Sequence, residues 1–108
     1  MAIIARGFID QEKLEKEVAE AVKALDPREV RDVHFILGED HTGDPSIFFR
    51  ILLTPEAAQD SRIGEVAGRV RTQLSDTLQT YNRWGLLDYF NFTSNPKMYR
   101  DPRWAMME

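Results

Sequence analysis

The chain has 108 residues, of which 43% are hydrophobic and 30% charged, and its formal net charge is −4. This length suits one small globular domain, and the composition differs from that of a disordered chain. The absence of cysteine excludes disulfides, thiolate metal sites and thiol nucleophiles. No apolar run is long enough for a signal peptide or a membrane span, so we expect a cytoplasmic protein that does not enter membranes.

Charge is distributed unevenly along the chain. Residues 1–60 contain 13 acidic and 7 basic side chains, whereas residues 61–108 contain 5 acidic and 7 basic ones. The acidic first part and the mildly basic second part could attract each other, within one fold or between two copies. Nucleic-acid binding usually accompanies a clear basic excess, so nucleic acid ranks last among the expected partners.

The first helix is predicted over residues 10–26. Asp10 is a good N-cap residue, and Asp26 precedes Pro27, which disfavours helical backbone at the residue before it. Between them the apolar residues recur every three or four positions and form one helical stripe, at Leu14, Val18, Val22 and Leu25.

The next two segments alternate with a period of two residues, which is typical of β-strands. The first begins at Val30 and the second spans Ser46 to Thr54. The Gly/Asp/Pro-rich connection Gly38–Pro45 predicts an antiparallel hairpin with a loop longer than the favoured two residues. The side chains expected on the core face are Val33, Phe35, Leu37, Ile47, Phe49, Ile51 and Leu53.

A second helix is predicted from Ile63 to Tyr81 by apolar residues at helical spacing. Gly64 and Gly68 inside it indicate close packing on the sheet or on the first helix. After this helix, the segment Tyr89–Phe92 alternates like a strand, with its two phenylalanines toward the core.

These elements predict an α+β fold: a two-layer αββαβ sandwich whose three-stranded, mostly antiparallel sheet carries two helices on one face. Residues 1–93 form the expected single domain. Residues 94–108 form a tail with several large apolar groups, which we expect to dock on the domain or on a partner.

The outer face of the predicted sheet is too apolar to lie against water. The tail could cover it, another protein or a second copy could dock on it, or nucleic-acid bases could stack on it, which normally requires a positive surround. The favoured hypothesis is a non-enzymatic interaction module, either a homodimer or a binder of another protein. The candidate interface residues are His34, Ile36, Phe48, Arg50, Leu52, Tyr89, Tyr99 and Trp104.

The hairpin loop is the alternative site. Its carboxylates and imidazole are types that bind metal ions, although their spacing matches no known metal motif. The simpler interpretation is that the loop is a turn whose aspartates accept backbone hydrogen bonds. A metal- or ligand-dependent activity here is the alternative function; no cofactor is expected, and no catalytic residue is assigned. The loop residues concerned are Glu39, Asp40, His41, Thr42 and Asp44.

Two stretches carry a family resemblance. Gly38–Phe49 reads GEDHTGDPSIFF, and Tyr89–Phe92 reads YFNF. They resemble a group of small uncharacterised bacterial proteins with a G-E-D-x-T-G-D-P-x-I-F-F segment followed by a helix and a Y-F-N-F segment. The likeness covers most of residues 30–93 and implies a bacterial source and a cytoplasmic setting. That group has no established activity, so the resemblance implies no catalytic residues.

Overall fold

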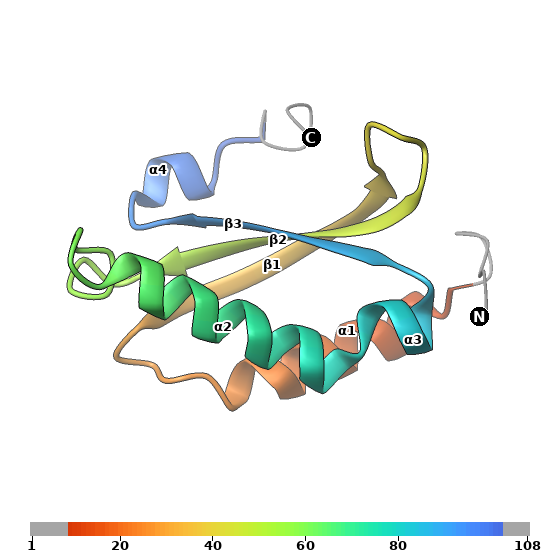
Figure 1. Ribbon diagram of the computed structural model, residues 1–108, viewed down its shortest axis with the longest axis horizontal. Coiled ribbons are helices and arrows are strands. Elements are labelled where there is room, and N and C mark those ends of the chain that lie inside the picture. Colours follow the sequence, from red (N-terminus) through yellow and green to blue (C-terminus); the bar gives the residue numbers. More distant parts are fainter. Residues whose placement is uncertain (1–8, 103–108) are drawn as a thin grey trace.

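The computed structural model describes residues 9–102 as a three-stranded sheet with helices on both of its faces (Figure 1). The helices that precede the last strand lie below the sheet in this view, and the short C-terminal helix lies above it. The α+β class and the three strands are therefore confirmed. In chain order the elements are α1 (Gln11–Lys23), β1 (Val30–Glu39), β2 (Pro45–Leu53), α2 (Ile63–Leu78), α3 (Thr80–Trp84), β3 (Leu87–Thr93) and α4 (Pro96–Tyr99).

The sheet is mixed, with β2 in the centre. β1 pairs antiparallel with β2, as the hairpin predicted, but β3 pairs parallel with β2. The predicted mostly antiparallel sheet is therefore wrong for the β2–β3 pair. The reason is the connection: α2 and α3 carry the chain back beneath the sheet, so β3 starts at the same end as β2, as in any crossover of a dozen residues or more.

The first helix follows its local signals. The Asp10 carboxylate accepts a hydrogen bond from the Lys13 backbone N–H at 3.1 Å, and the helix ends with Ala24 as its C-cap, before Pro27. Leu14, Val18 and Ala21 are buried. Local capping and periodicity were therefore sufficient to place this helix.

The core lies between the sheet and the α1–α2 layer, as the alternation predicted. Phe49 is fully buried and its ring stacks on Phe90 of β3 at 5.0 Å. Burial of one such side chain is worth roughly 1.5–3 kcal/mol. The other large apolar side chains that are fully buried among the described residues are Leu14, Ile47, Ile51, Leu53, Val66, Leu74, Leu78 and Leu86.

The second helix is shorter than predicted because the chain breaks at Gln79, whose backbone is left-handed (φ 49°, ψ 54°). Asp88 at the start of β3 accepts hydrogen bonds from Ser75 Oγ at 2.8 Å and Thr80 Oγ1 at 2.7 Å. These bonds tie the two helices on either side of the break to the sheet. Gly85, also left-handed, then ends α3 and lets the chain enter β3.

The two glycines of α2 do not mark a close approach. A Cβ atom placed on Gly64 or Gly68 would meet no atom within 4 Å. The expected close packing is therefore wrong, and both positions have room for a side chain.

The uneven charges attract each other within the fold. Glu29 is buried in the turn just before β1, where it accepts hydrogen bonds from Arg62 (3.1 Å) and from both terminal nitrogens of Arg69. Arg83 of α3 forms a bidentate pair with Glu17 of α1 at 2.7 and 2.9 Å. Acids of the first part thus pair with arginines of the second.

Candidate functional site

The second face of the sheet, opposite α1 and α2, carries the predicted interface residues of the strands. Phe48, Arg50 and Leu52 of β2 are 4–7% exposed, whereas His34, Ile36 and Tyr89 on the outer strands are half-buried. Phe48 stacks on Tyr89 at 5.3 Å. Within the single chain, the β2 side chains on this face are therefore largely shielded from water.

The start of the tail lies on this face. Asn95 caps α4 by accepting hydrogen bonds from the backbone N–H groups of Lys97 and Met98. Tyr99 is 5% exposed and packs edge-on against the His34 ring at 4.7 Å. Arg50 donates a hydrogen bond to the Met98 carbonyl. Docking of the tail on its own domain is therefore present at α4, while Trp104 lies outside the described residues.

Burial sets the protonation of this polar cluster. Burial lowers the pKa of His34. The Asp32 carboxylate opposes this shift, and the Arg50 charge adds to it. Burial also raises the pKa of the Tyr99 hydroxyl, in the same direction as the nearby Asp32 charge. At neutral pH the cluster thus contains a neutral imidazole beside the buried guanidinium.

The hairpin loop is held together by hydrogen bonds to the Asp40 carboxylate. One carboxylate oxygen accepts hydrogen bonds from the backbone N–H groups of Thr42 (2.9 Å) and Asp44 (3.0 Å) and from the Thr42 hydroxyl (2.6 Å). The other accepts one from the Tyr89 hydroxyl at 2.7 Å. The bonds from Thr42 and Tyr89 hold the pKa of Asp40 well below its usual value. This carboxylate therefore acts as a turn-forming acceptor.

The loop is also shorter than predicted, because β1 extends to Glu39 and β2 begins at Pro45. Glu39 and His41 are exposed, and the Thr42 hydroxyl oxygen also lies 3.0 Å from an Asp44 carboxylate oxygen. Among residues 9–102 no group of three or more acidic or histidine side chains is arranged to hold a metal ion. Of the predicted loop residues, Asp40, Thr42 and Asp44 are brought together as a hydrogen-bonded turn.

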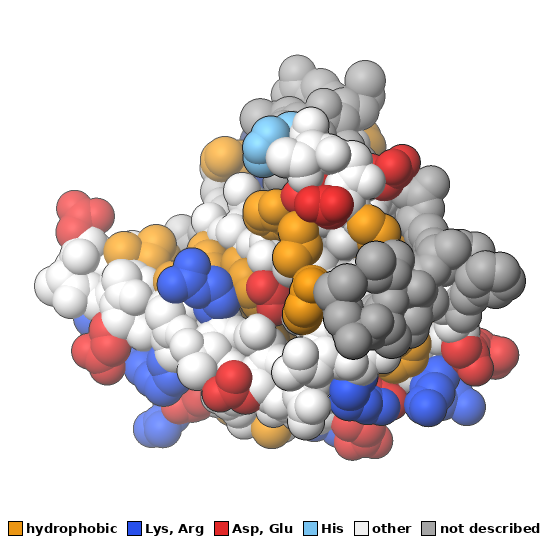
Figure 2. Space-filling view, turned by 45° about the vertical axis from the view of Figure 1, so that its right-hand side comes forward, with side chains coloured by type: hydrophobic (Ala, Val, Ile, Leu, Met, Phe, Trp, Pro, Cys, Tyr) orange, Lys and Arg blue, Asp and Glu red, His pale blue; other side chains and the backbone are white. Residues whose placement is uncertain are grey.

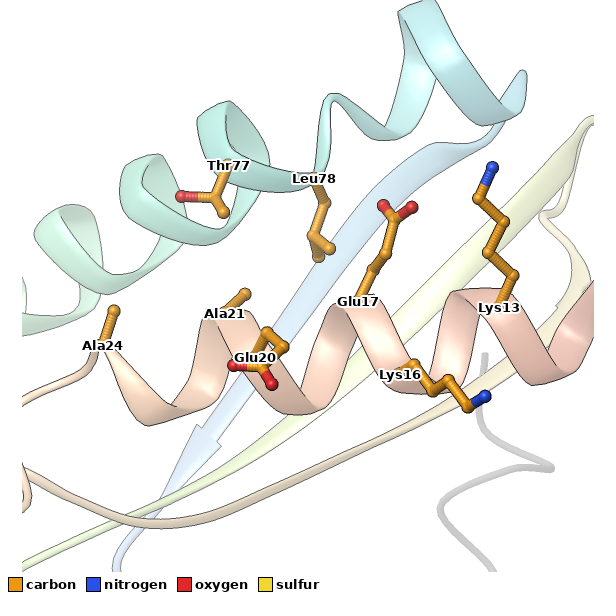
Figure 3. Close-up of a pocket in the computed structure, with 8 residues that line it drawn as sticks. All are labelled: Lys13, Lys16, Glu17, Glu20, Ala21, Ala24, Thr77 and Leu78. Atoms are coloured by element: carbon orange, nitrogen blue, oxygen red, sulfur yellow. The ribbon is translucent and has the colours of Figure 1, made fainter.

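Among the described residues, a groove lies on each side of α1. One lies between α1 and α2, has a volume of about 380 Å³, and is lined by apolar groups with a charged rim. Figure 3 shows Ala21 of α1 and Leu78 of α2 pointing toward each other across it, while Lys16 points away. This groove lies on the side of the sheet that α1 and α2 cover. Figure 2 shows charged side chains gathered toward the bottom of the view, below the exposed hydrophobic ones.

The second groove lies between α1 and β1, at the edge of the sheet, with a volume of about 430 Å³. β1 pairs only with β2, so its other side is an unpaired edge among the described residues. Sequence reasoning missed this edge because periodicity reveals which residues form a strand but not which strand lies outermost. The groove is lined by Gln11, Glu15, Val18, Ala19, Val22, Val33, His34 and Phe35.

The edge of β1 is apolar at its centre. Val33, Phe35, Ile36 and Leu37 are all half-buried, and the strand has no proline or lysine. Natural edge strands are usually protected from pairing by such residues, by bulges or by a covering element. In β1 the only register irregularity lies at its start, between Val30 and Asp32. Among the described residues, the centre of this edge, Val33–Leu37, therefore has no proline, lysine or bulge to oppose pairing.

Comparison with known proteins adds no relative. No family model, no curated protein and no solved structure matches the chain. The resemblance to the group with the G-E-D-x-T-G-D-P segment consequently stays a prediction. In the part of the chain that the structure describes, no helix is long and apolar enough to cross a membrane.

Proposed function

We propose that this protein is an interaction module that binds another polypeptide through the β1 edge and the adjoining α1–β1 groove. The single observation that carries the proposal is the ten-residue edge strand with an apolar centre beside an apolar groove. An added strand would gain main-chain hydrogen bonds from the edge and side-chain contacts in the groove. The cytoplasmic setting and the bacterial source remain predictions.

The contact surface proposed here differs from the sheet face favoured by the sequence. Phe48, Arg50 and Leu52 are already buried within the chain, and α4 lies on that face. A partner at that face would have to displace the chain's own contacts. The β1 edge requires no such displacement, which is why we favour it.

The alternative activity at the hairpin loop has less support. The Asp40 carboxylate already accepts four hydrogen bonds from within the chain. A metal ion that took this carboxylate would compete with those donors. We therefore do not propose a metal-dependent activity as a second function.

The test uses two matched substitutions on α1. Ala19 and Ala24 are both exposed, but Ala19 lines the groove at the β1 edge and Ala24 lines the groove between α1 and α2. Ala19→Lys places a charged side chain at the proposed contact, whereas Ala24→Lys places the same side chain at the other groove.

Association is measured by light scattering over a range of concentrations and by affinity capture from a lysate of the source organism. We expect wild type and Ala24→Lys to associate and Ala19→Lys to lose at least tenfold in affinity. Loss in Ala24→Lys alone, or no association of any kind by wild type, would overturn the proposal.

A further inference from the structure

We propose that α4 is a proton-sensitive strap: a proton added to His34 releases Tyr99 from the second face of the sheet while the rest of the fold stays intact. The proposal goes beyond the contact at the β1 edge and does not depend on it. It follows from the few contacts that hold α4, from the position of Arg50 opposite His34, and from the ring contact that covers the imidazole.

Docking of α4 depends on few contacts. Of its four residues, Pro96–Tyr99, only Tyr99 is buried, and the Met98 side chain is 55% exposed. The Tyr99 ring packs edge-on against His34, and the Met98 carbonyl accepts a hydrogen bond from Arg50. Figure 1 shows α4 on the opposite side of the sheet from α1 and α2. Its release would therefore leave the main core covered.

Arg50 lies directly opposite His34 in the sheet. The two residues are partners in the antiparallel register of β1 and β2, and Asn91 of β3 lies on the other side of Arg50. Directly opposed side chains of antiparallel strands share a face, with Cβ atoms about 4.5–5.5 Å apart, and like charges at such positions repel. Arg50 is buried and stays charged at any physiological pH. A protonated His34 would therefore form a like-charge pair with a buried guanidinium.

The other charged groups near His34 only partly offset this repulsion. Asp32 of β1 attracts a protonated imidazole, and Glu15 of α1 lines the same groove as His34. Burial and the Arg50 charge outweigh Asp32, since the pKa of His34 is lowered despite it. The charged residues of α4 and of the turn after it are Lys97, Arg100 and Asp101.

Linkage gives the direction of the change. While Tyr99 covers His34, the imidazole binds a proton less readily than a solvated imidazole does, because burial disfavours the charged form. A proton therefore binds more tightly to the released state, and a fall in pH must shift the population toward release. Docking is favoured above the ordinary histidine pKa of 6.5 and weakens as the pH drops below it.

Hydrogen exchange at two backbone N–H groups of this segment tests the proposal. The Tyr99 N–H donates to the Asn95 carbonyl at 3.0 Å, and the Arg100 N–H donates to the Pro96 carbonyl at 3.1 Å. Exchange is followed by NMR between about pH 7 and pH 5 and divided by the intrinsic rate at each pH. We expect the protection of both groups to fall at least about threefold over this range.

Substitution of His34 should abolish this fall. His34→Phe keeps a ring against Tyr99 but cannot be protonated, and His34→Gln repeats the test without the larger ring. His41→Phe is the matched control, because it removes the exposed imidazole of the hairpin loop and should keep the fall. A constant protection in wild type, or an equal fall in both His34 variants, would overturn the proposal.

Glu15→Gln is the control for the neighbouring carboxylate. It removes the acid that lines the same groove as His34 and should keep the wild-type fall. Loss of the fall in Glu15→Gln would assign the titration to Glu15 and would overturn the role of His34.

Low concentrations of urea separate the release of α4 from unfolding of the whole chain. Local opening exposes little surface, so exchange at Tyr99 should hardly change with urea, whereas exchange at Phe49 in the centre of β2 should rise steeply. An equally steep rise at both positions would show that α4 leaves the sheet only when the chain unfolds. That result would overturn the strap.

Discussion

His34 illustrates how a single side chain couples α4 to the sheet. Its ring lies between β1 and Tyr99, and burial lowers its pKa below the ordinary value of 6.5. The unfolded chain therefore binds a proton at a higher pH than the folded one. By linkage, the free energy of unfolding must fall as the pH drops below about 6.5 toward the folded pKa.

We predict that this loss is visible between pH 7.5 and 5 and disappears in His34→Gln. The charged groups that affect the pKa of His34 are Asp32 and Arg50. Urea denaturation at each pH measures the effect. His41→Gln removes the other, exposed imidazole and should keep the wild-type slope; an unchanged slope in His34→Gln would contradict the explanation.

At the scale of the element, α2 contains two glycines that its packing does not need. The space around Gly64 and Gly68 is open, and neither has a positive φ. Alanine is about 0.5–1 kcal/mol better than glycine inside a helix. Gly64→Ala and Gly68→Ala should each raise the free energy of unfolding by about that amount in urea denaturation. A destabilised variant that also associates less would instead indicate that the glycines face a second chain.

At the junction between α2 and α3, by contrast, a residue with a side chain occupies a backbone conformation that favours glycine. Gln79 has a positive φ of 49°, which costs a residue with a side chain roughly 1–2 kcal/mol relative to the right-handed helix. Gln79→Gly should therefore stabilise the protein by up to about 1 kcal/mol. Gly85→Ala is the mirror control: φ is 68° there, so alanine should destabilise it. Thermal melts of both variants measure the difference, and a destabilised Gln79→Gly would mean that its side chain matters more than its backbone.

At the scale of the whole molecule, Glu29 joins the acidic first part to the basic second part. It is nearly buried and accepts hydrogen bonds from Arg62 and Arg69, which are themselves about half exposed. Glu29→Gln should lower the free energy of unfolding by about 1–3 kcal/mol, because charge-assisted hydrogen bonds are lost in a buried place. Urea denaturation measures this loss, provided that the free energy of unfolding depends on urea concentration with the same slope in both proteins.

Glu65 provides the control for that change. It pairs with the same Arg69 at 3.4 Å, but its side chain is 81% exposed. Glu65→Gln should change the free energy of unfolding by no more than about 0.5 kcal/mol. Equal effects at both positions would contradict the importance of burial.

Local patterns predicted much of this fold. The Asp10 cap and the apolar spacing placed α1, and the alternation in both hairpin strands identified the core face correctly. These features depend on neighbours within four residues, so the sequence alone determines them. The candidate site was harder to predict from the sequence, because the burial of Phe48 and the packing of Tyr99 on His34 depend on residues far apart in the chain.

The sequence by itself therefore determined the two long helices and the three strands, the facing of the strands and the surplus of apolar surface beyond one core. Only the tertiary structure decided that β3 runs parallel to β2, that the helix breaks at Gln79, and that α4 lies on the second face. It also decided that β1 is an outer strand. The physical reason is that strand order and the covering of a face depend on contacts between distant segments, which local periodicity does not encode.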